Sequence, residues 1–409
     1  MRLSWWRRVA VFLAVVGPGI ITGNVDNDAG GITTYSIVGA HYGYSMLWVL
    51  LLTTIALVVI QEMSSRLGAV TGKGLADLIR ERFGIRATVF VILLLILANV
   101  ATTISEFAGV AAAAEILGIS RYIAVPAVGL FVWLLVFRGS FQAVERTMLL
   151  LVVLFGTYII SGVMARPVWG DVWRGLLVPS VSYGPGYISL VIALIGTTIT
   201  PWMQFYQQAL VVDKGLGQAD LPYVRADTYI GAIMTDVFSF FMIVSCGATL
   251  FQHGIRIESA GEAAMALEPF AGRYATVLFA IGLLNASTMA ASVLPVSTAH
   301  AVAEAFGFES SIGSRFRDAP VFMGLYAFFL LSGMTILAFP RANLVRVMVF
   351  SQTVNGILLP VVLIAMLRLI NDKRIMGQHT NGPIANMIAW TQTLVLIGLT
   401  AILLFESIA

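Results

Sequence analysis

The chain has 409 residues, of which 59% are hydrophobic and 11% are charged, with a net charge of +3 and a mean hydropathy of +0.91. A soluble globular chain carries about 25% charged residues, so this composition excludes a soluble fold and predicts a polytopic membrane protein. Nucleic-acid binding is also excluded, because no basic run with interleaved aromatic residues accompanies the small positive charge.

Apolar runs fill the chain. A hydrocarbon core of roughly 30 Å is crossed by about 20 helical residues. We identify eleven runs of sufficient length, near residues 9–41, 45–67, 86–117, 121–138, 144–166, 184–211, 227–252, 272–305, 319–338, 343–368 and 384–406. They predict an all-α transmembrane domain over residues 1–409, with a first repeat at about 9–166, a second at about 184–368 and an extra helix at 384–406.

The first run is interrupted by a polar segment between Gly17 and Gly31. This segment contains Asn24, Asp26 and Asp28. A bilayer core has no water for unpaired backbone groups, so an unwound stretch with acidic side chains persists there only where it lines a cavity or holds a ligand. We therefore expect a broken first helix that binds a cation.

The sixth run is interrupted in the same way by the sequence GTTITPW at residues 196–202. Interrupted spans at corresponding positions of two five-helix halves are typical of transporters built from inverted repeats, whose substrate site lies at the midplane. The pattern predicts a five-plus-five inverted repeat with broken helices 1 and 6.

The basic residues gather on one side of the predicted spans. Most of the 24 Lys and Arg residues fall in the N-terminal segment and the even-numbered connections, such as the stretch from Arg66 to Arg86, which also suggests an interfacial helix. By the positive-inside rule this side is cytoplasmic. We expect a multi-pass protein of the plasma or inner membrane with its N-terminus in the cytoplasm and, after eleven spans, its C-terminus outside.

Several stretches, in order along the chain, resemble one family. Residues 40–44 (AHYGY) are similar to its A-Q-F-G-Y, and Gln61 with residues 66–68 (RLG) and 71–76 (TGKGLA) to its Q…R-L-G…T-G-K-D-L-A. Residues 351–354 (SQTV) and 371–377 (NDKRIMG) are similar to its S-Q-V-V and S-D-R-R-x-M-G. The chain thus resembles the NRAMP divalent-metal transporters over nearly its whole length, which implies a LeuT-like fold and a divalent metal ion as substrate.

Two departures from the family pattern concern the metal ligands. The family has D-P-G-N where this chain has Asp28-Ala29-Gly30-Gly31, and M-P-H where it has Thr200-Pro201-Trp202. The thioether that favours soft transition metals is therefore replaced by a hydroxyl, and an all-oxygen site suits hard cations. Magnesium is usually held by one or two carboxylates with several waters retained. The pattern resembles the NRAMP-related magnesium transporters, so we expect partly hydrated Mg²⁺.

The resemblance and the two breaks together give the candidate metal ligands. Asp28 stands at the family's carboxylate position, and the carbonyl of Thr197 and the hydroxyl of Thr200 lie on the facing break. Gln352 matches a Gln of the tenth span, and Asn355 is one helical turn away.

Three further positions belong to the first break, and some roles stay open. Asn24 and Asp26 are additional polar groups that could instead cap or pair within the break, and Gly31 leaves room for a water ligand. Thr200 could equally cap its own half-helix, and Asn355 could hydrogen-bond only to neighbouring helices.

Proton coupling is not expected. Where proton-coupled family members carry D-x-x-E and two His residues, this chain has Thr103-Ile104-Ser105-Glu106, Trp202 and Gln207. Of these only Glu106 can change its charge near neutral pH, and it could equally be a structural hydrogen-bond partner. We expect uncoupled transport by alternating access.

Two other functions stay open: a proton-coupled Mn²⁺ or Fe²⁺ transporter of the same family, and a Na⁺-coupled organic solute carrier on the same scaffold. We expect no enzyme activity and no resident cofactor, because no G-x-S-x-G, Walker A or HExxH motif occurs. The expected partners are the metal substrate and the lipid bilayer, without an obligate protein partner.

Overall fold

The computed structural model describes residues 17–138, 152–153, 155–182, 186–257, 273–308 and 319–408. Within these ranges every regular element is a helix, and eight helical spans are long and apolar enough to cross a membrane. The prediction of an all-helical polytopic membrane protein is therefore confirmed. The first residues of the predicted run 9–41 and much of the run 144–166 lie outside the described residues.

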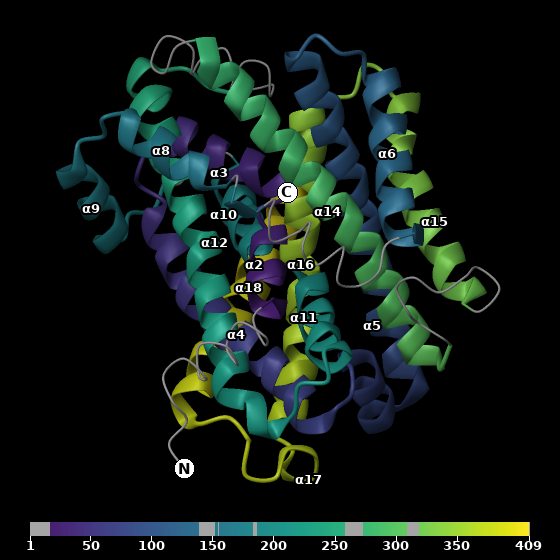
Figure 1. Ribbon diagram of the computed structural model, residues 1–409. Helices are drawn as coiled ribbons and strands as arrows, with labels where there is room; N and C mark the ends of the chain where they lie inside the picture. Colours follow the sequence, from purple (N-terminus) through teal and green to yellow (C-terminus); the bar gives the residue numbers. More distant parts are fainter. Residues whose placement is uncertain are drawn as a thin grey trace, which may run out of the picture.

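The broken first run forms two short helices, and three longer helices follow them (Figure 1). The helices up to the second break are α2 (Pro18–Val25), α3 (Ala29–Tyr42), α4 (Leu47–Thr71), α5 (Leu75–Ile116), α6 (Arg121–Arg138), α8 (Gly156–Met164), α9 (Trp169–Leu177) and α10 (Tyr187–Thr198).

The remaining helices complete the bundle. They are α11 (Pro201–Asp213), η1 (Gln218–Asp220), α12 (Leu221–Thr249), η2 (Phe251–His253), α14 (Arg273–Phe306), α15 (Pro320–Met334), η3 (Thr335–Ala338), α16 (Leu344–Ile370), α17 (Lys373–Met376) and α18 (Pro383–Ile408).

The connection between the second and third spans is shorter than the predicted 66–86. Helix α4 continues to Thr71 and ends at Gly72, whose φ of 64° is a left-handed conformation. Helix α5 starts at Leu75 and is interrupted at Gly84, where φ is 79° and ψ is 174°. The helix expected in this connection corresponds to the part of α5 that precedes Gly84, and its place at the membrane interface stays a prediction.

The broken helices lie at the centre of the bundle, between α12 and α16 (Figure 1). Helix α12 packs on α2 through glycines: a Cβ on Gly231 would lie 2.2 Å from the carbonyl oxygen of Gly19. Small residues allow such close helix contact within a membrane. The Asp227 carboxylate of α12 also accepts hydrogen bonds from the backbone N–H groups of Gly17 (3.1 Å) and Gly19 (2.6 Å), at the N-terminus of α2. Helix α2 is therefore fixed to α12.

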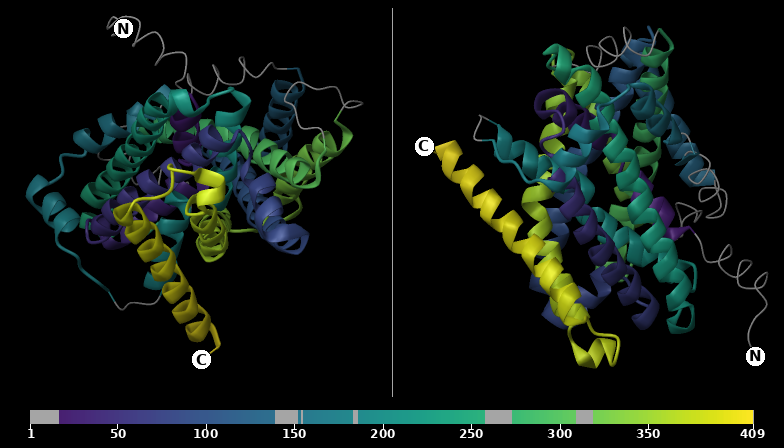
Figure 2. Two further views of the ribbon diagram at one scale, coloured as in Figure 1. Left: turned by 90° about the horizontal axis from the view of Figure 1, so that it is seen from below. Right: turned by 90° about the vertical axis from the view of Figure 1, so that its left-hand side faces the viewer.

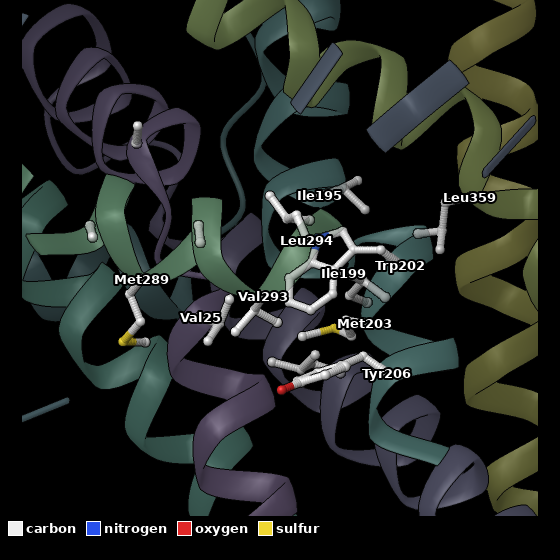
Figure 3. Packing of buried hydrophobic residues seen from close by; sticks show 14 of the residues in the cluster. Val25, Ile195, Ile199, Trp202, Met203, Tyr206, Met289, Val293, Leu294 and Leu359 are labelled. Atoms are coloured by element: carbon white, nitrogen blue, oxygen red, sulfur yellow. The ribbon is translucent and has the colours of Figure 1, made fainter. Parts of the chain in front are cut away.

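An apolar cluster packs around the second break (Figure 3). Trp202 is fully buried and its ring lies 6.0 Å from that of Tyr206, measured between centroids. Ile199 and Val25, next to the two breaks, belong to the same cluster and are also buried. Trp202, which stands where the family has His, is therefore part of the hydrophobic core.

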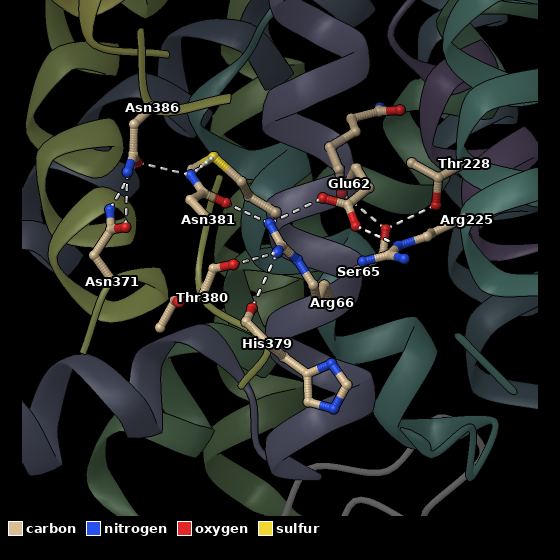
Figure 4. A network of polar contacts seen from close by, with 12 residues as sticks. Glu62, Ser65, Arg66, Arg225, Thr228, Asn371, His379, Thr380, Asn381 and Asn386 are labelled. Carbon is tan, nitrogen blue, oxygen red and sulfur yellow. Dashed lines mark hydrogen bonds and ion pairs between the residues drawn. The ribbon is translucent and has the colours of Figure 1, made fainter. Parts of the chain in front are cut away.

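A polar network ties α4 to α12 and to the connection before α18 (Figure 4). Arg66 forms an ion pair with Glu62 (3.1 Å) and donates to the carbonyl oxygens of His379 (3.0 Å) and Thr380 (3.2 Å) and to the side chain of Asn381. Glu62 also pairs with Arg225 of α12 (2.7 Å). Arg66 thus holds the returning chain against the end of α4.

Helix α18 lies at the edge of the molecule, and Figure 2 shows it diverging from the bundle toward its C-terminal end. Only 22% of its most apolar window is buried. Most of this helix is therefore left uncovered by the described part of the chain.

Candidate metal centre

The first break separates α2 from α3 at Asp26–Asp28. Asp28 is the N-cap of α3, and its Oδ1 accepts a hydrogen bond of 2.6 Å from the backbone N–H of Gly31. This geometry is favourable for a carboxylate, since the N-terminus of a helix carries unpaired N–H groups and a partial positive charge. The polar composition of the segment thus correctly predicted a break, and the break fixes the orientation of Asp28.

The second break separates α10 from α11 at Ile199 and Thr200, both of which have extended backbone conformations. Pro201 occupies the first turn of α11, where its missing N–H costs nothing. The same missing N–H deprives the Thr197 carbonyl, four residues earlier, of its usual helical donor. This carbonyl is therefore available for another partner.

Thr200 joins the two breaks. Its side chain makes no capping bond to α11, although the residue stands at the N-cap position. Instead its hydroxyl donates to Oδ1 of Asp26 at 3.0 Å. The structure therefore does not show the capping role considered for Thr200, and its role as a metal ligand stays a prediction.

Gln352 of α16 reaches the first break from the side. Its Nε2 donates to both carboxylate oxygens of Asp28, at 3.0 and 3.1 Å. Asn355 lies behind it: its Nδ2 donates to Oε1 of Gln352 (2.9 Å) and to the hydroxyl of Thr102 (3.1 Å). Asn355 is thus linked to Asp28 through Gln352, with Thr102 anchoring the chain of amides to α5.

Three other predicted site residues, Gly31, Thr197 and Asn24, belong to the two breaks. A Cβ on Gly31 would lie 3.0 Å from Oγ1 of Thr197 and 3.3 Å from Oδ1 of Asp28, so Thr197 faces the first break beside the carboxylate. The Thr197 hydroxyl is buried and has no hydrogen-bond partner in the described part of the chain. Asn24 donates from Nδ2 to the Ile20 carbonyl (2.7 Å), while its buried Oδ1 is unpaired among the described residues.

Glu106 also contacts the first break. Its Oε2 accepts a hydrogen bond of 3.1 Å from the backbone N–H of Ala29, and it is close enough to interact with the Asp28 carboxyl. Its Oε1 has no partner within the described ranges. The bond to Ala29 therefore supports the role of Glu106 as a structural hydrogen-bond partner.

The sequence did not single out two polar residues beside the site. Asn27 donates to the carbonyl (3.1 Å) and hydroxyl (2.8 Å) of Thr235 on α12 and accepts from the hydroxyl of Ser239 (2.9 Å). Its place within the polar break was a signal that could have identified it. Asp236 of α12 is buried with both carboxylate oxygens unpaired among the described residues, and no sequence pattern marks it.

The centre is strongly acidic and closed. Asp26, Asp28, Glu106 and Asp236 are at most 4% exposed, and the ion pairs of the described residues involve none of them. Buried carboxylates without basic partners favour the uptake of a cation.

The donor set also limits how such a cation is held. The described residues contain no group of three or more His, Cys, Asp or Glu side chains placed to hold a metal ion. A metal ion at Asp28 would therefore take its remaining ligands from amide, hydroxyl, carbonyl and water oxygens.

Comparisons with known proteins agree with this architecture. Residues 19–406 match the family described as "Natural resistance-associated macrophage protein-like". The divalent metal cation transporter MntH of Deinococcus radiodurans is 30% identical, over 98% of this chain and 91% of that protein.

Solved structures show the same fold. A manganese transporter of Eremococcus coleocola superposes with a TM-score of 0.80 at 22% identity, covering 98% of this chain and 87% of its own. MhsT, solved in complex with L-phenylalanine, superposes with a TM-score of 0.61 at 16% identity, covering 99% of each chain. The expected inverted-repeat fold with two broken helices is thereby confirmed. The chain belongs to the natural resistance-associated macrophage protein (NRAMP) family of membrane transporters.

Proposed function

We propose that this protein carries divalent metal ions across the cell membrane and that its main substrate is Mg²⁺ in partly hydrated form. The observation that carries the proposal is the set of donors around the two breaks: Asp28, Asp26, Thr200, Thr197 and Gln352 offer carboxylate, hydroxyl, carbonyl and amide groups and no sulfur. Such donors suit a hard cation that keeps part of its water shell.

Asp28 is the primary ligand in this proposal. It is fully buried, its charge has no basic partner in the described part of the chain, and it lies at the point where α2 and α3 separate. Asp26 bonds to Thr200 of the facing break, and Thr197 of that break lies beside Gly31. Gly31 has no side chain and so offers no amide ligand, and Oγ1 of Thr197 and Oδ1 of Asp28 lie 3.0 and 3.3 Å from the position that a Cβ would take.

Gln352 must change its orientation when a metal ion binds. In the structure its NH₂ group faces Asp28, and a cation at Asp28 would be repelled by that group. Turning the amide by half a rotation presents Oε1 to the ion. Asn355 can follow, because the Thr102 hydroxyl is within reach of both Oδ1 (3.4 Å) and Nδ2 (3.1 Å) of Asn355. We therefore assign Gln352 as a ligand and Asn355 as the residue that positions it.

Alternating access would open the centre to one side at a time by moving the half-helices. With the N-terminus in the cytoplasm, inward flux of a divalent ion would draw on the membrane potential. That potential is worth about 2.3 kcal/mol per charge per 100 mV, or roughly 4.6 kcal/mol for two charges. This suffices for more than roughly a thousandfold accumulation without protons.

The residues at the family's proton-relay positions support uncoupled transport. Trp202 is apolar and buried, and Gln207 donates to the hydroxyls of Ser65 (3.1 Å) and Thr228 (3.4 Å). Neither can carry a proton near neutral pH. Glu106 is bonded to the backbone of Ala29, which favours its structural role.

Manganese is the second candidate substrate. It is favoured by the names of the relatives, which are divalent metal cation transporters and manganese transporters. The family assignment favours either metal over an organic solute.

Flux into proteoliposomes separates these candidates. Purified protein would be reconstituted with a magnesium-sensitive dye trapped inside, and Mn²⁺ and Ca²⁺ would be added as competitors. We expect Mg²⁺ influx that depends on the protein. Influx of Mn²⁺ with no Mg²⁺ influx would overturn the magnesium proposal and leave the metal-transporter proposal standing.

A further inference from the structure

A polar cavity of about 580 Å³ lies where α5, α16, α17 and α18 meet. This volume is within the range of roughly 300–1,000 Å³ that is usual for small-molecule sites. The lining comes from α5 just before the interruption at Gly84, from the last turn of α16, from α17 and from the first turns of α18, at the end of the molecule that is lowest in Figure 1. The positive-inside rule predicts that this end is cytoplasmic.

The cavity carries an excess of positive charge. Its charged side chains are those of Arg82, Arg368, Lys373, Arg374 and Asp372, so the lining has three excess positive charges. The one carboxylate is already paired: Oδ2 of Asp372 accepts from Nε of Arg82 (2.7 Å) and from Nη2 of Arg374 (2.9 Å). Arg368 and Lys373 take part in none of the ion pairs of the described residues. Two cations of the cavity therefore lack a counter-ion from this part of the chain.

The neutral polar groups of the lining are already bonded to each other. The side-chain amides of Asn371 and Asn386 exchange two hydrogen bonds, of 2.8 and 2.9 Å, which join the end of α16 to α18. Asp372 is the N-cap of α17 and accepts from the backbone N–H of Arg374 at 3.0 Å. These contacts hold the walls of the cavity together and leave the unpaired cations to bind a ligand.

Apolar side chains complete the lining and point to a lipid rather than a soluble anion. Phe83 of α5 and Trp390 of α18 belong to them, and α5, α16 and α18 are all candidate membrane spans. Trp390 is two turns from the start of α18, and Trp is enriched at the level of lipid headgroups because its ring is apolar and its N–H is polar. A ligand with a negative charge and an apolar part matches this combination.

We propose that this cavity binds the phosphate group of one anionic phospholipid, with Arg368 and Lys373 as its counter-ions and the acyl chains leaving past Phe83 and Trp390. Basic pockets between membrane helices on the cytoplasmic side suit phosphate headgroups. Arg can give a phosphate two parallel hydrogen bonds, and Lys adds a compact positive charge. A zwitterionic phospholipid has the same phosphate but carries its own cation, so it gains less from the two unpaired charges.

The test measures the lipid that the full chain retains in native mass spectrometry. The protein would be released from nanodiscs that contain equal amounts of phosphatidylglycerol and phosphatidylcholine with the same acyl chains. We expect phosphatidylglycerol to be preferred by roughly fivefold or more, since one basic residue near the membrane surface has about a fivefold effect. Arg368→Gln combined with Lys373→Gln should retain the two lipids equally.

A matched variant and a soluble competitor complete the test. Arg346→Gln makes the same substitution in an exposed arginine in the first turn of α16, at the opposite end of that helix from the cavity, and should keep the preference. Inorganic phosphate in excess offers the same charge without acyl chains. We expect it to leave the retained lipid in place.

Three results would overturn the proposal. Equal retention of the two lipids by the wild type would show that the cavity does not select an anionic headgroup. A preference that is the same in the double variant and in Arg346→Gln would place the lipid elsewhere. Displacement of the lipid by inorganic phosphate would show that the cavity is a site for a soluble phosphate.

Discussion

The amide nitrogen of Gln352 lies 3.0 and 3.1 Å from the two carboxylate oxygens of Asp28, although 324 residues separate them in the chain. This contact joins α16 to the first break and brings the two residues that we assign as metal ligands within one hydrogen bond of each other. Asn355 and Thr102 extend this chain of hydrogen bonds to α5, so it links α3, α16 and α5.

Replacing the Asp28 carboxylate should stop transport. Asp28→Asn keeps an oxygen that can accept from the N–H of Gly31 but removes the charge that attracts the ion. Mutating a residue that only hydrogen-bonds to a metal ligand typically lowers activity by roughly 10- to 100-fold. Asp28 is proposed to contact the ion directly, so we expect a larger fall in Mg²⁺ flux. The control is Asp171→Asn, which alters an exposed carboxylate in the first turn of α9 and should leave the flux unchanged. An equal loss of flux in both variants would contradict the assignment of Asp28 as a ligand.

A thioether at position 200 should change the metal preference. Thr200→Met restores a soft ligand, so we expect binding of Cd²⁺ to strengthen by about tenfold relative to Mg²⁺. Calorimetric titration of the purified protein measures both affinities. Thr200→Val separates the gain of sulfur from the loss of the hydroxyl that donates to Asp26. If Thr200→Met and Thr200→Val have the same selectivity, the ligand at position 200 does not govern ion choice.

Gly30 leaves the space that Gln352 occupies. A Cβ on Gly30 would lie 2.0 Å from Nε2 of Gln352, so Gly30→Ala should push the amide away from Asp28. A flexible side chain can move, and we expect little change in stability but a roughly tenfold higher KM for Mg²⁺. Gly324→Ala on α15, where the added methyl group meets open space, is the control. An unchanged KM in Gly30→Ala would argue against Gln352 as a ligand.

Arg66 should matter for stability. Arg66→Met removes its bonds to residues 379–381 and leaves the buried Glu62 with Arg225 alone (Figure 4). Because breaking a buried ion pair is costly, we expect a loss of about 2–4 kcal/mol, seen as a lower unfolding temperature in detergent. Arg374→Met, which removes an exposed partner of Asp372, should change the unfolding temperature little. Similar shifts in the two variants would contradict the role of Arg66 in holding the chain before α18.

Sequence reasoning predicted the two breaks because their cause is local. Gly and carboxylates between residues 17 and 31, and Pro201 after a polar pair, are incompatible with a continuous membrane helix. It could not predict that Thr200 would bond to Asp26 rather than cap α11, because this depends on how close the two breaks approach in space.

Contacts across the fold were less accessible to sequence reasoning. The place of Gln352 beside Asp28 was available only through the family resemblance. The contacts of Arg66 with residues 379–381 could not be inferred, because they depend on where the chain returns after α16. Asn27 was missed although it lies in the polar break, because its partners Thr235 and Ser239 belong to α12.

The most direct test of the account follows Mg²⁺ and protons together. Proteoliposomes would contain a magnesium dye and a pH dye, with the membrane voltage clamped by a potassium gradient and ionophore. If transport is uncoupled, Mg²⁺ enters without acidification of the lumen, and an imposed proton gradient does not accelerate it. Acidification that tracks Mg²⁺ influx in the wild type and disappears in Glu106→Gln would contradict uncoupled transport and make Glu106 the proton carrier.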